Sequence, residues 1–259
     1  MSGFDVAAFE AERASRGLGL GSAIAWREST ESTNDDAQAA AKSGAPHGAV
    51  FGAETQTRGR GRRGSEWSSA AGEGLWFSVV LRPQLSAELV SGLALGAGLS
   101  VRVATAARSS QQVFVKWPND VLVGSRKLAG VLVESQVNGA SVASVVVGIG
   151  INVEQRDFPA ELRDIATSLA LLDAAPRARE TLLVDVLLAL QTRLEVLQTR
   201  GMAGLAEELR YHDALLGKRL LVDERAGTGA GVDDDGRLLL RLSDGTISPQ
   251  LSGHVQILR

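Results

Sequence analysis

One short segment of the sequence combines four arginines with three glycines. Residues 58–64 read Arg-Gly-Arg-Gly-Arg-Arg-Gly. Glycine allows a backbone to approach a ligand closely, and guanidinium groups bind carboxylates and phosphates through paired hydrogen bonds. The segment therefore indicates a loop that binds an anionic, phosphate-bearing ligand.

The same residues allow two other interpretations. They match the glycine spacing of dinucleotide-binding folds, but that motif must open a helix. Residues 65–74 contain Trp67, paired serines and two glycines, with no apolar helical face. A solvated basic loop or a nucleic-acid patch stays open from this segment alone, although a net charge of −3 gives no general attraction to nucleic acid.

Three further segments place small residues beside polar ones. Residues 116–120 read Lys-Trp-Pro-Asn-Asp, residues 127–130 read Lys-Leu-Ala-Gly, and residues 148–152 read Gly-Ile-Gly-Ile-Asn. Glycines at alternate strand positions indicate close packing against that face. Each segment also has an ordinary structural alternative: a hairpin turn, a surface lysine, and a helix packed on the glycine face.

Composition excludes several kinds of chemistry. The chain has 259 residues, of which 44% are hydrophobic and 22% charged, as in globular proteins. The absence of cysteine excludes thiolate metal ligands and a cysteine nucleophile, and the three histidines lack metal-ligand spacing. There is no signal-peptide pattern and no run of ~20 apolar residues. We therefore expect a cytoplasmic protein that does not bind membranes.

Hydrophobic periodicity predicts the elements that must position these segments. Strands are expected at 23–28, 48–56, 75–81, 113–116, 128–137 and 141–153, the last two joined by an Asn138-Gly139 turn. Helices are expected at 5–16, after Ser32-Thr33-Asn34, at 88–107, around 183–197 and at 204–214. Small hydroxyl residues before a helix can accept hydrogen bonds from the N–H groups of its first turn. Short strands with Asp-Gly turns follow, so we predict a mixed α/β domain over 1–213 and a small β-barrel over 214–259.

Taken together, these segments resemble the motifs of biotin protein ligases. Residues 32–34 and Gln56, the loop 59–64 followed by Trp67, and the three segments above occur in that family's order and spacing between residues 23 and 168. The resemblance implies an α/β (α+β) fold: a mixed sheet with flanking helices like that of class II aminoacyl-tRNA synthetases, plus a small C-terminal SH3-like β-barrel.

The family's reaction, which the resemblance implies for this chain, has two steps. Biotin attacks the α-phosphate of ATP to give biotinyl-5′-AMP and pyrophosphate, and a lysine of a biotin carboxyl carrier domain then displaces AMP. No protein nucleophile is needed, but two anions must be brought together and neutralised. ATP, Mg²⁺ and biotin are therefore expected, with no tightly bound prosthetic group.

The resemblance also implies roles for individual residues. Biotin contacts are expected from Ser32, Thr33, Asn34, Gln56, Gly59, Arg60, Gly61, Arg62, Lys127, Gly130 and Gly148. ATP contacts are expected from Arg62, Arg63, Trp67, Lys116, Asn119, Asp120 and Asn152, and Asn152 is also expected beside Mg²⁺. Lys127 and Arg62 are expected to be the catalytic residues.

Regulatory members of the family carry a DNA-binding domain before the catalytic part. The residues that precede Ser32 are too few for such a domain, so we expect no DNA binding, and a monomer or weak homodimer. Two alternatives stay open: a lipoate or octanoate ligase on the same fold, and a non-catalytic biotin-binding module. The polar set of serine, threonine, asparagine and glutamine favours biotin, because a saturated chain offers little to hydrogen-bond.

Overall fold

The larger sheet of the protein is mixed and has seven strands. The computed structural model describes residues 3–83, 90–138, 141–172 and 178–258. The strand order is β1-β2-β3-β7-β6-β5-β4, in which β1 and β2 are parallel and all other neighbours antiparallel. The strands are β1 (Ile24–Thr30), β2 (Val50–Gln56), β3 (Gly74–Leu81), β4 (Val113–Lys116), β5 (Asp120–Val123), β6 (Arg126–Asn138) and β7 (Ser141–Asn152). The predicted mixed α/β fold is confirmed.

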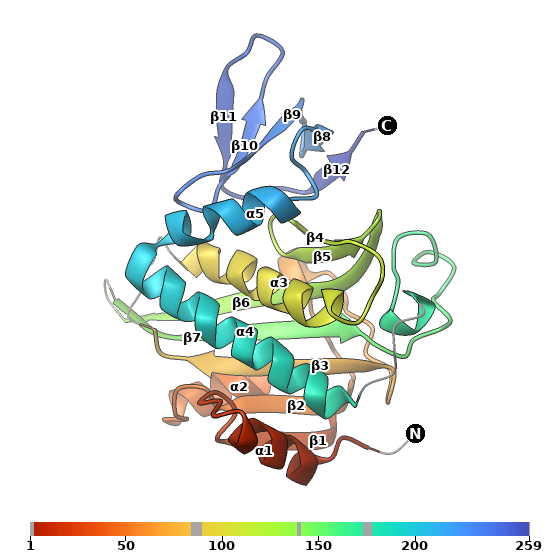
Figure 1. The fold of residues 1–259 in the computed structure, drawn as a ribbon, viewed down its shortest axis with the longest axis vertical. Coiled ribbons are helices and arrows are strands. Elements are labelled where there is room, and N and C mark those ends of the chain that lie inside the picture. Colours follow the sequence, from red (N-terminus) through yellow and green to blue (C-terminus); the bar gives the residue numbers. More distant parts are fainter. Residues whose placement is uncertain (1–2, 84–89, 139–140, 173–177, 259) are drawn as a thin grey trace.

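Helices cover both faces of this sheet. The helices α3 (Val90–Ala106) and α4 (Arg179–Arg200) lie over one face, with α1 (Val6–Ser15) beside α4, and α2 (Thr33–Lys42) packs on the opposite face (Figure 1). Leucines of α4 recur on one side of the helix and are buried, as their spacing predicts: Leu183, Leu187, Leu190, Leu194 and Leu197. None of the helices in the described ranges is long and apolar enough to cross a membrane.

The two faces of β7 differ in the size of their side chains. Val145, Val147, Ile149 and Ile151 belong to the main hydrophobic core, on the α3 and α4 side. Because side chains alternate along a strand, Gly148, Gly150 and Asn152 face the side on which α2 lies. The missing side chains at the two glycines leave room on that face, and the candidate site is built there.

A second, antiparallel sheet forms the C-terminal part of the chain (Figure 1, blue). Its order is β11-β10-β9-β8-β12, and it follows the 3-10 helix η4 (Met202–Leu205) and α5 (Ala206–His212). The strands are β8 (Arg219–Val222), β9 (Arg225–Val232), β10 (Leu238–Arg241), β11 (Ile247–Gln250) and β12 (Val255–Ile257). The expected all-β C-terminal unit is therefore present, and the boundary expected after residue 213 falls between α5 and β8.

The C-terminal sheet and the segment that leads into it both contact the larger sheet. The indole Nε1 of Trp117, in the turn between β4 and β5, donates a 2.9 Å hydrogen bond to the carbonyl of Gly236. The backbone of Asp213 pairs with Val115 of β4, and Ala214 N–H donates to the Val115 carbonyl over 2.9 Å. Burial raises the pKa of Asp213 to about 6, although the N–H groups of Leu215 and Leu216 oppose that shift.

Three strands of the structure were not predicted from the sequence. These strands are β5, β9 and β11; β9 contains three glycines and β11 contains Pro249, and both residue types weaken a strand pattern. The proline is tolerated because β11 lies at the edge of its sheet. Residues 88 and 89 of the expected helix, and Gly139 of the expected turn, lie outside the described residues, but β6 and β7 pair as antiparallel neighbours.

Candidate active site

A cavity of about 680 Å³ lies on the α2 face of the larger sheet. Its walls come from the start of α2, the arginine loop, the β4–β5 turn, the glycine-bearing ends of β6 and β7, and residues 253–255 of the C-terminal unit. Every residue predicted to bind biotin or ATP lines this cavity except Gly59. Gly59 is buried, and a Cβ there would lie 2.5 Å from the Trp67 carbonyl oxygen, so it allows the two sides of the loop to meet.

One end of the cavity is a network of neutral polar groups. The Gln56 side-chain oxygen accepts hydrogen bonds from Thr33 N–H at 2.9 Å and from the Thr33 hydroxyl at 3.1 Å, and its nitrogen donates to Ser69 at 2.8 Å. The Ser78 hydroxyl lies 2.6 Å from Asn34 Oδ1 and 2.9 Å from Thr33 Oγ1. These hydrogen bonds fix the side chains at this end of the cavity.

Ser32 differs from the expectation that its hydroxyl caps α2. It occupies the N-cap position, but its side chain makes no capping hydrogen bond; the N–H of the first helical residue, Thr33, donates to Gln56. Ser32 is 2% exposed and lines the cavity. Within the described part of the chain no hydrogen bond is made by its hydroxyl, so this group is available to a ligand.

The middle of the cavity is apolar and rests on glycine backbone. Gly130 and Gly150 lie opposite each other in the β6–β7 pair. A Cβ would lie 3.0 Å from the Trp67 ring at Gly130 and 2.7 Å from it at Gly150, so this ring covers both glycines. The close packing that alternate glycines predict is confirmed, and Trp67 lines the cavity instead of lying in the core.

Gly148 supports a second close contact on the same face. A Cβ there would lie only 1.9 Å from Asn34 Oδ1. The Asn34 amide nitrogen donates to Glu134 at 2.7 Å, which fixes the amide over Gly148. The alternative that a helix packs on the glycine face is therefore correct at this position, because Asn34 belongs to α2.

The other end of the cavity concentrates positive charge. Lys127 Nζ lies 2.6 Å from Asp120 Oδ1 and 5.0 Å from the centre of the Trp67 ring. Burial lowers the pKa of Lys116, an effect that Asp120 opposes and Lys127 reinforces. Burial also lowers the pKa of Arg62, with Arg63 adding to the shift and Asp120 opposing it. Three cations therefore surround one carboxylate, and the excess charge suits an anionic ligand.

Two asparagines at this end are already engaged with the backbone. Asn119 donates a 2.6 Å hydrogen bond to the Val131 carbonyl, which fixes the β4–β5 turn on β6. Asn152 is 5% exposed, lines the cavity, and donates from its side-chain nitrogen to the Thr167 carbonyl at 2.9 Å, while its side-chain oxygen bonds to no described residue. Among the described residues, no group of three or more histidine, aspartate or glutamate side chains could hold a metal ion.

Sequence reasoning missed several residues of this site. Gly150 was predicted to be a close-packing position, because it alternates with Gly148 in an apolar strand, but it was not assigned to the site. Ser78 is the one polar residue of its apolar strand, and Glu134 is one of three consecutive polar residues near the end of another, so neither pattern pointed to a site. Residues 253–255 were also missed, because nothing in the sequence shows that the C-terminal unit reaches the cavity.

Comparison with known proteins identifies the class that this fold and site define. The model of the biotin/lipoate A/B protein ligase family matches residues 26–152. The biotin--[acetyl-CoA-carboxylase] ligase of Mycobacterium tuberculosis is 35% identical over 252 residues, covering 91% of each chain. The bifunctional ligase/repressor BirA of Bacillus spizizenii is 35% identical over 87% of this chain and 71% of its own length.

A solved structure agrees with these sequence relatives. The biotin protein ligase from Aquifex aeolicus in complex with biotin and ATP has a TM-score of 0.77 and 30% identity, over 92% of this chain and 99% of that chain. The chain therefore belongs to the biotin protein ligase family, and the resemblance read from its motifs is confirmed.

Proposed function

We propose that this chain is an ATP-dependent biotin protein ligase, which forms biotinyl-5′-AMP and transfers biotin to a lysine of a biotin carboxyl carrier domain. One observation carries the proposal: a single cavity has a neutral polar end, an apolar middle covered by Trp67, and a cationic end. Biotin has the same sequence of parts, a ureido ring, an aliphatic tail and a carboxylate. The cavity can therefore hold the ring at one end and present the carboxylate at the other.

The polar end suits a group with both donors and acceptors. Ser32 has an uncommitted hydroxyl, and Gln56 retains one amide hydrogen after its bond to Ser69. A ureido ring offers two N–H donors and one carbonyl acceptor, so it can bond to the Ser32 hydroxyl and to the remaining Gln56 N–H. A lipoyl group would leave these buried polar atoms without partners, which is costly, so the site favours biotin over lipoate.

The cationic end suits the first chemical step. A biotin carboxylate oxygen would bond to the α-phosphorus of ATP, the bond from that phosphorus to the bridging oxygen would break, and pyrophosphate would leave. Arg62, Lys116 and Lys127 would lower the repulsion between the two anions, and Asp120 would orient Lys127. Arg62 and Lys127 are therefore the proposed catalytic residues.

The second step needs only a neutral amine and a good leaving group. The acceptor lysine nitrogen would bond to the acyl carbon, the carbon–oxygen bond to AMP would break, and the amine would lose a proton. The positive charges that served the first step would also stabilise AMP as it leaves. The acceptor domain is proposed from the chemistry of the family.

Mg²⁺ is proposed as a partner of ATP. The described residues offer no cage of carboxylates, and Mg²⁺ is commonly held by substrate phosphates with one or two protein oxygens. The side-chain oxygen of Asn152 fits that requirement. The ion would supply positive charge to the phosphates.

The remaining predicted contacts are retained as proposals. We assign biotin contacts to Ser32, Thr33, Asn34, Gln56, Arg60, Gly61, Arg62, Lys127, Gly130 and Gly148, with Gly59 shaping the loop. We assign ATP contacts to Arg62, Arg63, Trp67, Lys116, Asn119, Asp120 and Asn152. We also propose that residues 214–259 form a separate domain, that the protein is cytoplasmic, and that it is a monomer or weak homodimer.

The test is exchange of labelled pyrophosphate into ATP by the purified chain. Exchange should require biotin and Mg²⁺ together, and calorimetry should show biotin binding far more tightly than lipoate. Exchange that ignores biotin and responds to lipoate would assign the chain to the lipoate branch. Tight biotin binding with no exchange would indicate a non-catalytic binding module.

A further inference from the structure

The arginines of the loop do not all face the cavity in the same way. Three are paired with carboxylates of the chain itself: Arg58 with Glu31, Arg60 with Asp35 and Glu134, and Arg63 with Asp223. Arg62 makes no ion pair and no side-chain hydrogen bond to any described residue. Of the four loop arginines, Arg62 is therefore the one whose guanidinium is free to bind a ligand, whereas the other three are paired with carboxylates of the protein.

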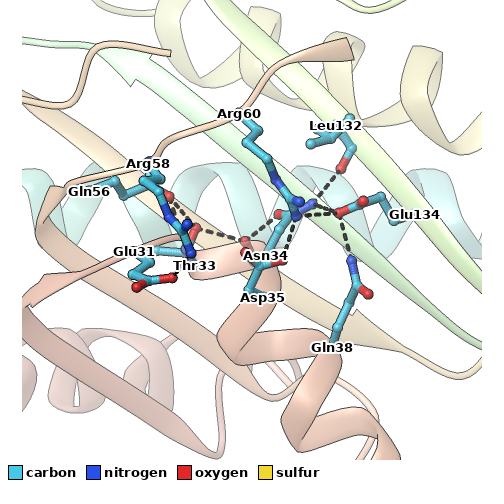
Figure 2. A network of polar contacts seen from close by, with 11 residues as sticks. Glu31, Thr33, Asn34, Asp35, Gln38, Gln56, Arg58, Arg60, Leu132 and Glu134 are labelled. Carbon is cyan, nitrogen blue, oxygen red and sulfur yellow. Dashed lines mark hydrogen bonds and ion pairs between the residues drawn. The ribbon is translucent and has the colours of Figure 1, made fainter. Parts of the chain in front are cut away.

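Arg60 is the arginine most closely tied to the polar end of the cavity. Figure 2 shows its guanidinium directed at Asp35, in the first turn of α2, and at Glu134 of β6. The distance from Arg60 Nη2 to Glu134 Oε2 is 3.8 Å. Arg60 therefore links the loop to a helix and a strand that are distant in sequence.

Glu134 connects this link to the residues that shape the cavity. Its Oε2 also accepts hydrogen bonds from Asn34 and Gln38, both at 2.7 Å (Figure 2). Asn34 is in turn bound to Ser78 and lies over Gly148. One carboxylate thus fixes both the loop and the start of α2.

Anchoring of the Arg60 side chain also fixes the position of the Arg60 backbone. Gly61 N–H donates to the Ser65 carbonyl at 2.7 Å, and Trp67 N–H donates to the Gly59 carbonyl at 2.9 Å. In such an antiparallel bridge, the N–H and carbonyl of the intervening Arg60 point away from its partner Glu66. Neither group bonds to any described residue, and Arg60 lines the cavity, so its position sets polar backbone atoms at the cavity wall.

We propose that Asp35 and Glu134 are positioning residues for biotin binding, which act by holding the guanidinium of Arg60 and thereby the backbone of the loop. This inference rests on the proposed function. The ion pair between Arg60 and Asp35 fixes the loop backbone at the polar end of the cavity. The reacting groups at the cationic end do not depend on this ion pair. Loss of the pair should therefore weaken biotin binding and leave the chemical step intact.

Pyrophosphate exchange at varied biotin and at varied ATP tests this on the whole chain. Asp35→Asn and Arg60→Gln should each raise the KM for biotin by roughly three- to tenfold, the size expected for loss of a partly exposed ion-pair network. The KM for ATP and kcat should stay within about twofold of the parent values. Trypsin should cleave the loop of the Asp35→Asn variant faster in the absence of ligand.

Asp36→Asn is the matched control. This neighbouring carboxylate is also in the first turn of α2, but it bonds to Thr30 at 2.8 Å and lies 3.8 Å from Arg27, away from the loop. It should leave the KM for biotin unchanged. Asp35→Glu keeps the charge and should restore most of the affinity, and high salt should raise the KM of the parent more than that of Asp35→Asn.

Two results would overturn the inference. An equal KM for biotin in the Asp35→Asn and Asp36→Asn variants would mean that the Arg60 pair does not position the loop. A fall in kcat at unchanged KM in Arg60→Gln would place Arg60 in the chemistry instead. Absence of biotin-dependent exchange in the parent protein is a different outcome, because it refutes the proposed function itself.

Discussion

Gly148→Ala would place a methyl group where the Asn34 amide now lies. The added Cβ would lie 1.9 Å from Asn34 Oδ1, 2.8 Å from its Cγ and 3.1 Å from its Nδ2. All three atoms belong to one side chain, so the clash can be relieved only if that side chain moves. Movement would break the 2.6 Å contact to Ser78 and the 2.7 Å hydrogen bond to Glu134.

These two hydrogen bonds set the expected magnitude. A hydrogen bond to a charged carboxylate contributes about 1.5–3 kcal/mol and a neutral one about 0.5–1.5 kcal/mol, so Gly148→Ala should lower the free energy of unfolding by about 2–4 kcal/mol. Overpacking of a methylene into a filled core costs about 1–3 kcal/mol, which is consistent with that range. The KM for biotin should rise too, because Asn34 lies beside Thr33.

A double-mutant cycle with Asn34→Ala checks the reasoning by urea denaturation. Asn34→Ala alone should also destabilise the protein, since it removes the same hydrogen bonds. In that background Gly148→Ala should cost little, because the clashing atoms are gone, which gives a coupling energy of about 2 kcal/mol or more. Additive losses in the double variant would refute the steric explanation.

Four further outcomes are expected. Lys127→Ala should lower the rate of adenylation by about 10²–10³ in a folded protein. The control variant Lys42→Ala, at an exposed lysine, should keep the parent rate. Equal adenylation rates in the two variants would mean that Lys127 is an ordinary surface lysine. The pKa of Asp213, raised to about 6 from 3.8, means that the folded state holds this proton more tightly, so stability is lost as pH rises through that window. Asp213→Asn should therefore be more stable than the parent in urea denaturation, by an amount that grows from pH 4 and reaches about 3 kcal/mol at pH 7, and a pH-independent difference would contradict this. Trp117→Phe keeps a ring but loses the donor to Gly236, which should cost about 1 kcal/mol and speed amide exchange in residues 214–258; unchanged exchange would show that this bond does not hold the C-terminal sheet. The net charge of −3 predicts no sequence-selective binding of duplex DNA, and salt-resistant, selective binding in a gel-shift assay would be evidence against it.

Elements with a clear apolar pattern could be predicted from the sequence. The continuous apolar run of β3 predicts a strand buried on both faces, the leucine spacing of α4 predicts an amphipathic helix, and both appear in the structure. The strands β5, β9 and β11 could not be predicted, because their pairing depends on neighbouring strands more than on their own residues. A local pattern predicts an element only when its own residues favour one structure, which the glycines of β9 and the proline of β11 do not.

The residues of the candidate site could also be predicted only in part. The sequence by itself determined which residue types gather: the arginine loop, Lys127, Asn152 and the alternating glycines all line the cavity, because the motifs sit at strand ends and turns that the fold brings together. It did not determine the partners of these residues.

Only the tertiary structure decided those partners. Arg60 lies 25 positions from Asp35, and Arg63 lies 160 positions from Asp223. An ion pair requires two groups within about 4 Å, and no period in a sequence encodes that distance across separate elements. The same holds for residues 253–255, which close the cavity because the C-terminal sheet packs beside the β4–β5 turn. Which arginine stays free for a ligand is therefore a property of the folded chain, because it depends on where the carboxylates lie once the sheet, helix and C-terminal unit have assembled.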